Sequence, residues 1–278
     1  MVGKSFRHLI RDTPGLRYVG RALQRSKFAF VDVMLPDVVR SLSWLFTSLE
    51  TTNLTYDLET MNRQFLAAFL AHILHTPRAL VLAYFDEVAQ DQDLLRYYRD
   101  ARALSRFGFI TDPDIRLGRR LLWYAAVRIM KPAVVVETGV DKGLGSLILC
   151  AALVRNAGEG NPGRYFGTDI KPDAGYLLGG KYSQVGTILY GDSIESLENF
   201  PDTIDLFISD SEHDPRYEAR EYDTISAKLA GKFLVISDQG TSSLMDAADR
   251  QGWTFLTFRE RSTGSVLQGA DFGVAYPS

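Results

Sequence analysis

The sequence is poor in cysteine and histidine: it has one cysteine, Cys150, and four histidines among 278 residues. A single cysteine cannot close an internal disulfide, which excludes a disulfide-stabilised scaffold and favours a reducing compartment. Long apolar runs are missing as well. The longest charge-free apolar window, residues 64–77, is shorter than the roughly 20 residues of a membrane-spanning helix. We therefore predict a cytoplasmic protein without a transmembrane segment.

An excess of positive charge is also absent. The chain carries 31 Lys and Arg against 34 Asp and Glu, for a formal net charge of −3. This balance argues against a protein that binds nucleic acid through bulk charge. Hydrophobic residues make up 46%, which is ordinary for a globular protein and excludes a disordered chain. We expect no nucleic-acid partner.

Residues 1–105 are helical in character. Apolar residues such as Leu66, Leu70 and Ile73 recur at three- and four-residue spacing, and Thr76-Pro77 ends that helix. Further helices are predicted over 77–85 and 92–104. We expect this helical region to serve as a lid or as a dimer contact in a homo-oligomer.

The first thirty residues are strongly basic. A basic amphipathic segment can lie on an anionic membrane surface or dock on an acidic partner. The alternative, which we favour from the sequence, is a solvated arm that packs across a neighbouring subunit. The basic residues are Lys4, Arg7, Arg11, Arg17, Arg21, Arg25 and Lys27, against one acid, Asp12.

Residues 106–278 alternate short apolar, β-branched runs with helices. Near-continuous apolar runs are typical of parallel strands that are covered on both faces. The last two runs have no helix between them and predict an antiparallel hairpin. The sequence therefore predicts an α/β fold, a Rossmann-like doubly wound sheet of seven strands. The runs are 133–137, 165–169, 187–190, 204–208, 233–236, 253–258 and 272–276.

In such a sheet, ligands bind beyond the carboxyl ends of the strands. The first loop there reads E-x-G-x-x-x-G-x-G over residues 137–145, which is not the dinucleotide fingerprint G-x-G-x-x-G. Glycines let the backbone approach a ligand and turn sharply into the next helix. The acid Glu137 would repel a pyrophosphate and suits a cationic ligand. The alternative is a tight strand-to-helix turn without a ligand.

The other predicted strands also end in acidic segments. Asp169 can accept both hydroxyls of a ribose, or it can cap the following turn. Asp192 and Ser193 can bind an adenine edge, or they can form a helix N-cap. After the fourth strand, three acids and His213 crowd five positions, and Asp238 ends the fifth strand. Because this edge of the sheet is where chemistry is expected, we predict a functional site there.

Four segments together resemble a class I S-adenosylmethionine-dependent methyltransferase. The segments are VVVETGVDKGLGSLI, GTDI, GDSIESL and IDLFISDSEHDPRYEAREYD, and the resemblance covers residues 106–278. The last segment is similar to one branch of small-molecule O-methyltransferases, which includes macrocin O-methyltransferase-like and cephalosporin-hydroxylase-like proteins. This resemblance implies a methyltransferase that binds S-adenosylmethionine.

The resemblance also implies how the cofactor would be held. Glu137, Gly139 and Gly143 would surround its methionine part, and Asp169 would hold the ribose hydroxyls. The other implied cofactor contacts are Ser146, Ile170 and Asp210, with Asp192 and Ser193 beside the adenine.

A divalent cation such as Mg²⁺ is implied in the same way. Asp210 and Asp238 match the positions of metal-binding acids after strands four and five. The remaining ligand would be Ser237 or Gln239, and neither is a carboxylate. Hard cations accept amide oxygens and water besides carboxylates, so Gln239 is the candidate for that place.

His213 is the candidate general base, with Asp210 as a second catalytic residue. An imidazole with a pKa near 6.5 suits removal of a hydroxyl proton at neutral pH. With a cation bound at Asp210 and Asp238, the cation would lower the pKa of the hydroxyl and His213 would orient the site. The alternative is a surface histidine beside acids.

We therefore expect an O-methyltransferase that acts on a hydroxyl of a small molecule, such as a sugar or natural product. A nicotinamide-dependent dehydrogenase is disfavoured, because 30 residues separate Gly139 from Asp169 where about 20 are expected. A cofactor-binding scaffold without turnover is a second alternative. Methylation of nucleic acid or protein is a weaker one, since the charge balance offers no basic groove.

Overall fold

The computed structural model describes residues 14–50, 55–239, 242–263, 266 and 269–278. The chain divides into two compact units: residues 1–48 with 264–266, and residues 49–263 with 267–278. The division predicted at residue 105 stays a prediction. In the described part of the chain, no helix combines the length and the apolar character that crossing a membrane requires.

The smaller unit is helical over residues 14–47. Helix α2 spans Pro14–Ser26, a π-helical segment spans Lys27–Met34, and helix α3 spans Leu35–Thr47. The π-helical segment leads directly into α3, whose first turn holds a proline, a residue with no N–H to donate to the preceding turn. Part of the basic segment, including Lys4, Arg7 and Arg11, lies outside the described residues.

The larger unit is built on a seven-stranded sheet in the order β4-β3-β2-β5-β6-β9-β7. The first five of these strands are parallel, and β9 is antiparallel to both of its neighbours. The predicted fold class and the antiparallel final pair are confirmed. The strands are β2 Val134–Thr138, β3 Arg164–Asp169, β4 Gly186–Tyr190, β5 Ile204–Ser209, β6 Leu229–Ser237, β7 Trp253–Arg259 and β9 Asp271–Pro277.

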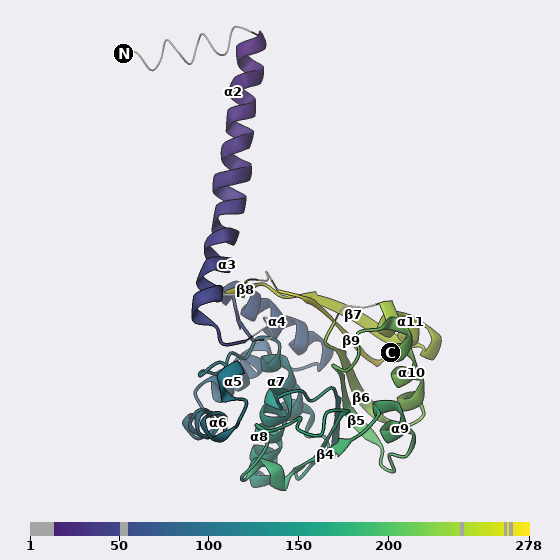
Figure 1. Ribbon diagram of the computed structural model, residues 1–278. Coiled ribbons are helices and arrows are strands. Elements are labelled where there is room, and N and C mark those ends of the chain that lie inside the picture. Colours follow the sequence, from purple (N-terminus) through teal and green to yellow (C-terminus); the bar gives the residue numbers. More distant parts are fainter. Residues whose placement is uncertain (1–13, 51–54, 240–241, 264–265, 267–268) are drawn as a thin grey trace. The chain divides into compact units, whose positions relative to one another are not determined.

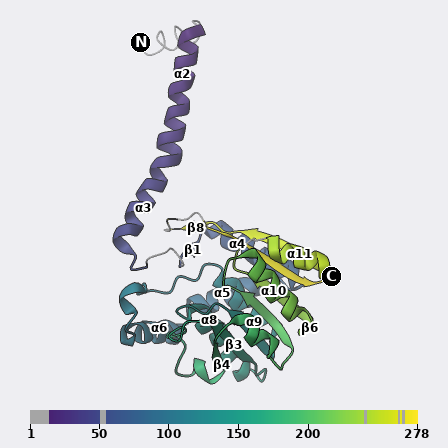
Figure 2. The ribbon, with the colours of Figure 1, turned by 45° about the vertical axis from the view of Figure 1, so that its right-hand side comes forward.

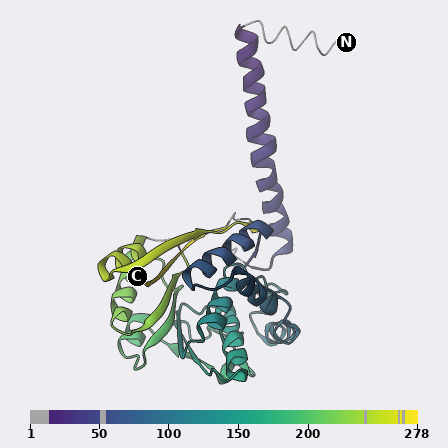
Figure 3. The ribbon, with the colours of Figure 1, turned by 180° about the vertical axis from the view of Figure 1, so that it is seen from behind.

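Helices cover both faces of this sheet (Figures 1 and 3). One layer contains α4 Thr60–Ile73, α5 Arg78–Ala89, α6 Gln92–Leu104, α7 Arg120–Met130 and α8 Leu144–Gly158. The other layer contains α9 Ser193–Glu198, α10 Pro215–Ser226 and α11 Ser242–Gln251, which Figure 2 shows next to one another. Short 3-10 turns lie at Gly108–Ile110 and Tyr182–Gln184.

Strand β2 shows why the sheet needs both layers. Val135 belongs to the core on the side of α7 and α8, whereas Val134 and Val136 belong to the core on the side of α10 and α11. Side chains alternate between faces along a strand, so an apolar run with no polar alternation requires cover on both sides. The strand is accordingly buried along its whole length.

A second, two-stranded sheet joins distant parts of the larger unit. Strand β1, Asp57–Leu58, pairs antiparallel with β8, Ser262–Thr263. The side chain of Asn62 strengthens this connection, because its Nδ2 donates to the carbonyl of Arg259 and its Oδ1 accepts from the N–H of Arg261, at 3.0 and 2.9 Å. This sheet brings residues near 56 and 260 together beside the large sheet.

Candidate functional site

A cavity of about 670 Å³ lies at the carboxyl ends of the parallel strands. Its lining includes residues at or just after the end of each strand from β2 to β6, as the parallel topology predicts. Among the residues that the structure describes, eight acidic side chains line the cavity against four basic ones. The acids are Glu50, Glu137, Asp141, Asp169, Asp192, Asp210, Glu212 and Asp238, and the bases are Arg119, Arg120, Lys142 and Lys171.

The glycine loop after β2 is shaped by neighbouring protein backbone. Gly139 has φ +83°, and a Cβ there would overlap the carbonyl oxygen of Asp210. Gly143 has φ +88°, and its Cβ would lie 2.8 Å from the Cα of Gly175. Both positions therefore need glycine for close packing against other loops. Gly139 lines the cavity, whereas Gly143 does not.

Glu137, at the end of β2, is bonded inside the protein. Its Oε2 accepts hydrogen bonds from the hydroxyl of Ser146 at 2.9 Å and from the hydroxyl of Tyr165. Burial raises the pKa of Glu137 to about 7. Ser146 is itself buried and does not line the cavity. The Glu137 side chain, which borders the cavity, thus connects the start of α8 to β3 through hydrogen bonds.

Asp169 and Ile170, after β3, both line the cavity. Each carboxylate oxygen of Asp169 accepts one backbone N–H at 2.8 Å, from Asp141 and from Lys171. A carboxylate oxygen can accept a second hydrogen bond, so the side chain still has room for two hydroxyl donors. Ile170 is 75% exposed, although its side chain is apolar. This part of the cavity wall therefore places a hydrogen-bond acceptor, Asp169, next to an apolar side chain, Ile170.

Asp192 and Ser193 stand at the start of α9. Asp192 caps the helix by accepting the N–H of Glu195 at 3.0 Å, and its other carboxylate oxygen accepts the hydroxyl of Tyr217 at 2.8 Å. The hydroxyl of Ser193 donates to the buried carboxylate of Glu221. The helix-cap interpretation of Asp192 is therefore confirmed, and both residues also line the cavity.

Glu221 of α10 is a buried acceptor that the sequence interpretation missed. Its carboxylate accepts hydroxyls from residues at the ends of strands, besides that of Ser193. These donors are Thr138 at 3.2 Å, Ser209 at 3.1 Å and Ser211 at 2.7 Å. Glu221 falls within the segment IDLFISDSEHDPRYEAREYD, but its acids are too many for the sequence to single out this one.

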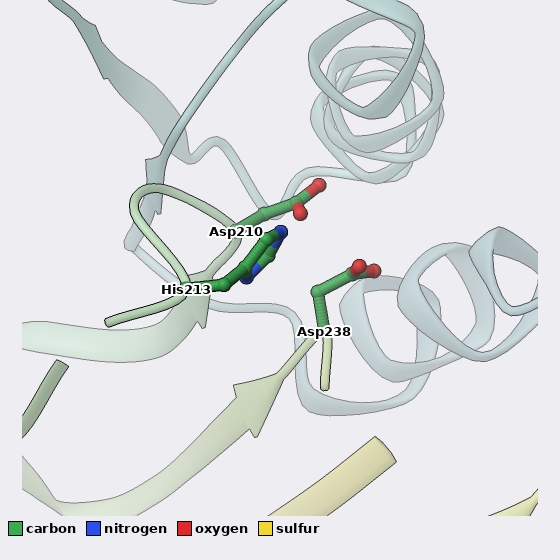
Figure 4. Close-up of side chains that lie close together, drawn as sticks. All are labelled: Asp210, His213 and Asp238. Carbon is green, nitrogen blue, oxygen red and sulfur yellow. The ribbon is translucent and has the colours of Figure 1, made fainter. Parts of the chain in front are cut away.

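Asp210, His213 and Asp238 meet at one side of the cavity (Figure 4). One ligand atom from each of the three lies within 4.8 Å of the others, a spacing compatible with a shared metal ion. Asp210 follows β5, His213 lies in the loop before α10, and Asp238 follows β6. The structure thus brings together the two predicted metal-binding acids and the predicted general base. Gln239, the next residue after Asp238, also lines the cavity.

The two aspartates have opposite pKa shifts. Burial and the neighbouring Asp238 carboxylate raise the pKa of Asp210 well above its ordinary value. Burial is also the largest influence on Asp238 and acts in the same sense. The charge and hydrogen bond of Arg119, the charge of Arg120 and a hydrogen bond with Asp210 together outweigh burial and lower the pKa of Asp238. Of the two carboxylates, Asp210 is therefore the one that binds a proton more readily. The pKa of His213 is raised by Glu218, whose Oε1 lies 3.9 Å from its Nδ1.

Arg119 connects Asp238 to the small sheet. Its side chain is 7% exposed and pairs with Asp238 at 2.6 Å and with the buried Glu260 at 2.7 Å. Tyr56 completes the cluster, because its hydroxyl donates to Glu260 at 2.6 Å and accepts from Arg119 at 2.9 Å. No sequence motif marked these three residues, because their contacts join segments far apart in the chain.

Residues 136–239 match the family model described as a methyltransferase domain. This match confirms the predicted methyltransferase family, and the branch within that family stays a prediction. No curated protein matches the sequence of the chain.

Solved structures similar to this chain include three methyltransferases. The O-methyltransferase TomG from Streptomyces achromogenes, involved in tomaymycin synthesis and solved with SAM, is 14% identical with a TM-score of 0.49, over 68% of this chain and 91% of TomG. An O-methyltransferase from Bacillus cereus solved with SAH is 12% identical with a TM-score of 0.49, over 72% and 97%. The SAH-bound methyltransferase PaMTH1 from Podospora anserina is 12% identical with a TM-score of 0.46, over 67% and 88%.

Proposed function

We propose that this chain, whose residues 136–239 form a methyltransferase domain, transfers a methyl group from S-adenosylmethionine to a hydroxyl oxygen of a small molecule. The observation that carries the proposal is the cavity at the carboxyl ends of the parallel strands. Its excess of acidic side chains attracts a cation, and its volume of about 670 Å³ suits a small organic ligand. The sulfonium cofactor is such a cation.

The residues of the cavity fit this cofactor. The carboxylate of Asp169 retains acceptor capacity for two ribose hydroxyls, and the exposed side chain of Ile170 gives the adjoining base an apolar surface. Asp192 and Ser193 line the next part of the wall, where the adenine would lie. Glu137 would position the glycine loop that contacts the methionine part of the cofactor. Ser146 would hold Glu137 in place through its hydrogen bond.

When bound, S-adenosylmethionine supplies a methyl group on a positively charged sulfur. The protein's task is to align an acceptor oxygen with that methyl group and to remove its proton, and alignment supplies much of the acceleration. His213 is 41% exposed on its side chain and reaches the cavity, so its imidazole can accept the proton of an entering hydroxyl. Glu218, and to a smaller extent Asp238, stabilise the imidazolium that results, since both raise the pKa of His213.

A divalent cation is a further part of the proposal. Two carboxylates with water in the remaining positions suit Mg²⁺, whereas an imidazole beside them would suit a transition metal. Asp210 and Asp238 would hold it, with Gln239 as the predicted further ligand, and His213 would then orient the site. Such an ion would favour the ionised form of the acceptor hydroxyl.

The test is methyl transfer by the purified chain. The protein is incubated with S-adenosylmethionine and a panel of sugars, phenols and aliphatic alcohols, and S-adenosylhomocysteine formation and methylated products are measured by mass spectrometry. Acceptor-dependent formation of an O-methyl product is expected. Product bearing the methyl group on nitrogen or carbon only would overturn the assignment to oxygen. Tight cofactor binding without turnover on any acceptor would favour the non-catalytic scaffold.

A further inference from the structure

The smaller unit exposes large apolar side chains along most of its helical length. Isolated exposed apolar residues are normal, but a continuous apolar surface marks a place where something binds. The exposed set is Tyr18, Val19, Leu23, Phe28, Phe30, Val31, Val33, Met34, Leu35, Val38, Val39, Leu42, Leu45 and Phe46.

Helix α2 has an apolar side and a basic side. Val19 and Leu23 are four residues apart and lie on one side, whereas Arg21 and Arg25, also four apart, lie on the other. Two positions along an α-helix are about 200° apart around its axis, so the two pairs face opposite ways. All four side chains are exposed.

The charge of this segment is one-sided. Residues 14–31 contain three arginines and a lysine and no acid. The acids of the segment come later, as Asp32 and Asp37, and Asp37 pairs with Arg40 on the same helix. The positive charges of α2 therefore have no counterpart within it.

A second copy of this helix would neither cover all of the exposed apolar side chains nor neutralise the basic ones. In a two-stranded coiled coil, the seam takes about two residues in seven, yet the exposed apolar residues include the consecutive set Val33, Met34 and Leu35. In a parallel pair, a second copy would also place its arginines opposite those of the first. An anionic lipid surface supplies negative charge to the basic side and hydrocarbon to the apolar side at once.

We propose that the helical segment of residues 14–47 binds an anionic lipid surface, with Arg21, Arg25 and Lys27 at the lipid headgroups. Phe30, Met34 and their apolar neighbours enter the boundary between headgroups and acyl chains. This attachment is independent of the methyl-transfer chemistry. It would concentrate the larger unit at the membrane, where acceptors with an apolar part accumulate.

The experiment is co-sedimentation of the full chain with vesicles of phosphatidylcholine alone or mixed with phosphatidylserine. We expect binding to the mixed vesicles that weakens as salt rises, because salt screens charge attraction. The double variant Arg21→Glu/Arg25→Glu should bind the mixed vesicles at least about tenfold more weakly, since each basic residue near an anionic surface contributes measurably. Phe30→Ser/Met34→Ser should lose binding to both kinds of vesicle.

The matched control is Arg96→Glu/Arg99→Glu on helix α6, where both arginines are exposed. It should bind as the unchanged protein does, and a comparable loss there would overturn the assignment to this segment. Equal binding to both vesicle types would overturn the anionic requirement. Sedimentation velocity without lipid tests whether a second copy of the chain covers the surface instead. If the protein is a dimer that Phe30→Ser/Met34→Ser converts to a monomer, and vesicles do not bind, the surface belongs to a dimer interface. An unchanged midpoint of thermal unfolding shows that each variant is folded.

Discussion

The guanidinium of Arg119 lies 2.6 Å from a carboxylate oxygen of Asp238. Arg119 stands at the N-cap of α7, and Asp238 follows the last residue of β6, so this contact joins the helical layer to the edge of the sheet that carries the cavity. The same guanidinium pairs with Glu260, which is fully buried. The cation thus offsets two carboxylates that would otherwise repel each other in the interior.

Replacement of this cation tests its contribution to stability. Arg119→Met leaves two buried carboxylates without their partner, and breaking a buried ion pair in this way costs about 3–5 kcal/mol. We expect a loss of that size in the free energy of unfolding by urea. The exposed pair of Arg96 gives the control, and Arg96→Met should cost less than about 1 kcal/mol. A loss for Arg119→Met as small as that of the control would contradict the interpretation.

Burial of Glu137 makes a specific prediction about pH. Its pKa is raised from 4.5 to about 7, so the folded state binds this proton more tightly than the unfolded state does. The associated stability is fully present below pH 4.5 and is lost as pH rises to about 7, a loss of about 3 kcal/mol.

The variant Glu137→Gln keeps the shape of the side chain and removes its titration. It should flatten the pH dependence of the unfolding free energy between pH 4.5 and 7. Glu198→Gln, at an exposed position of α9, should leave that dependence as it is. An unchanged slope in Glu137→Gln would show that another group is responsible.

His213 should matter for turnover and not for cofactor binding. His213→Ala removes the proposed general base, and such bases contribute about a hundredfold to ten-thousandfold in rate. We expect kcat to fall by about a hundredfold or more while the Kd for S-adenosylmethionine stays nearly unchanged. His72→Ala, at an exposed histidine of α4, is the control and should keep full turnover. Full turnover in His213→Ala would remove this residue from the mechanism.

A divalent cation at Asp210 and Asp238 should release a proton when it binds. Burial and the nearby Asp238 carboxylate raise the pKa of Asp210, whereas a cation binds the ionised forms of both carboxylates. Titration calorimetry with Mg²⁺ in two buffers of different ionisation enthalpy measures this release, and Asp210→Asn should abolish it. Absence of Mg²⁺ binding by the folded protein would leave Arg119 as the cation that pairs with Asp238.

The fold was largely predictable because its signal is local. Runs such as 133–137 and 204–208 are nearly continuous in apolar residues, which is typical of buried parallel strands. The parallel direction of the strands places the residues that follow them at one edge. For that reason the sequence alone could predict that Asp169, Asp210 and Asp238 share a site.

The parts that sequence reasoning missed depend on long-range contacts. Tyr56 and Glu260 are 204 positions apart and meet only because the two-residue strands β1 and β8 pair, and strands so short have no recognisable pattern. The glycine loop was also interpreted incompletely. Its glycines were expected to serve a ligand, whereas Gly139 and Gly143 are required by neighbouring backbone.

The most direct test of the central claim is calorimetric titration of the full chain with S-adenosylmethionine. We expect saturable binding that is clearly weaker in Asp169→Ala, because that variant removes the proposed ribose acceptor, and unchanged in Asp223→Ala, whose carboxylate is exposed on α10. NAD⁺ should not bind. A folded protein that fails to bind S-adenosylmethionine, or that binds NAD⁺ in its place, would contradict the proposed function.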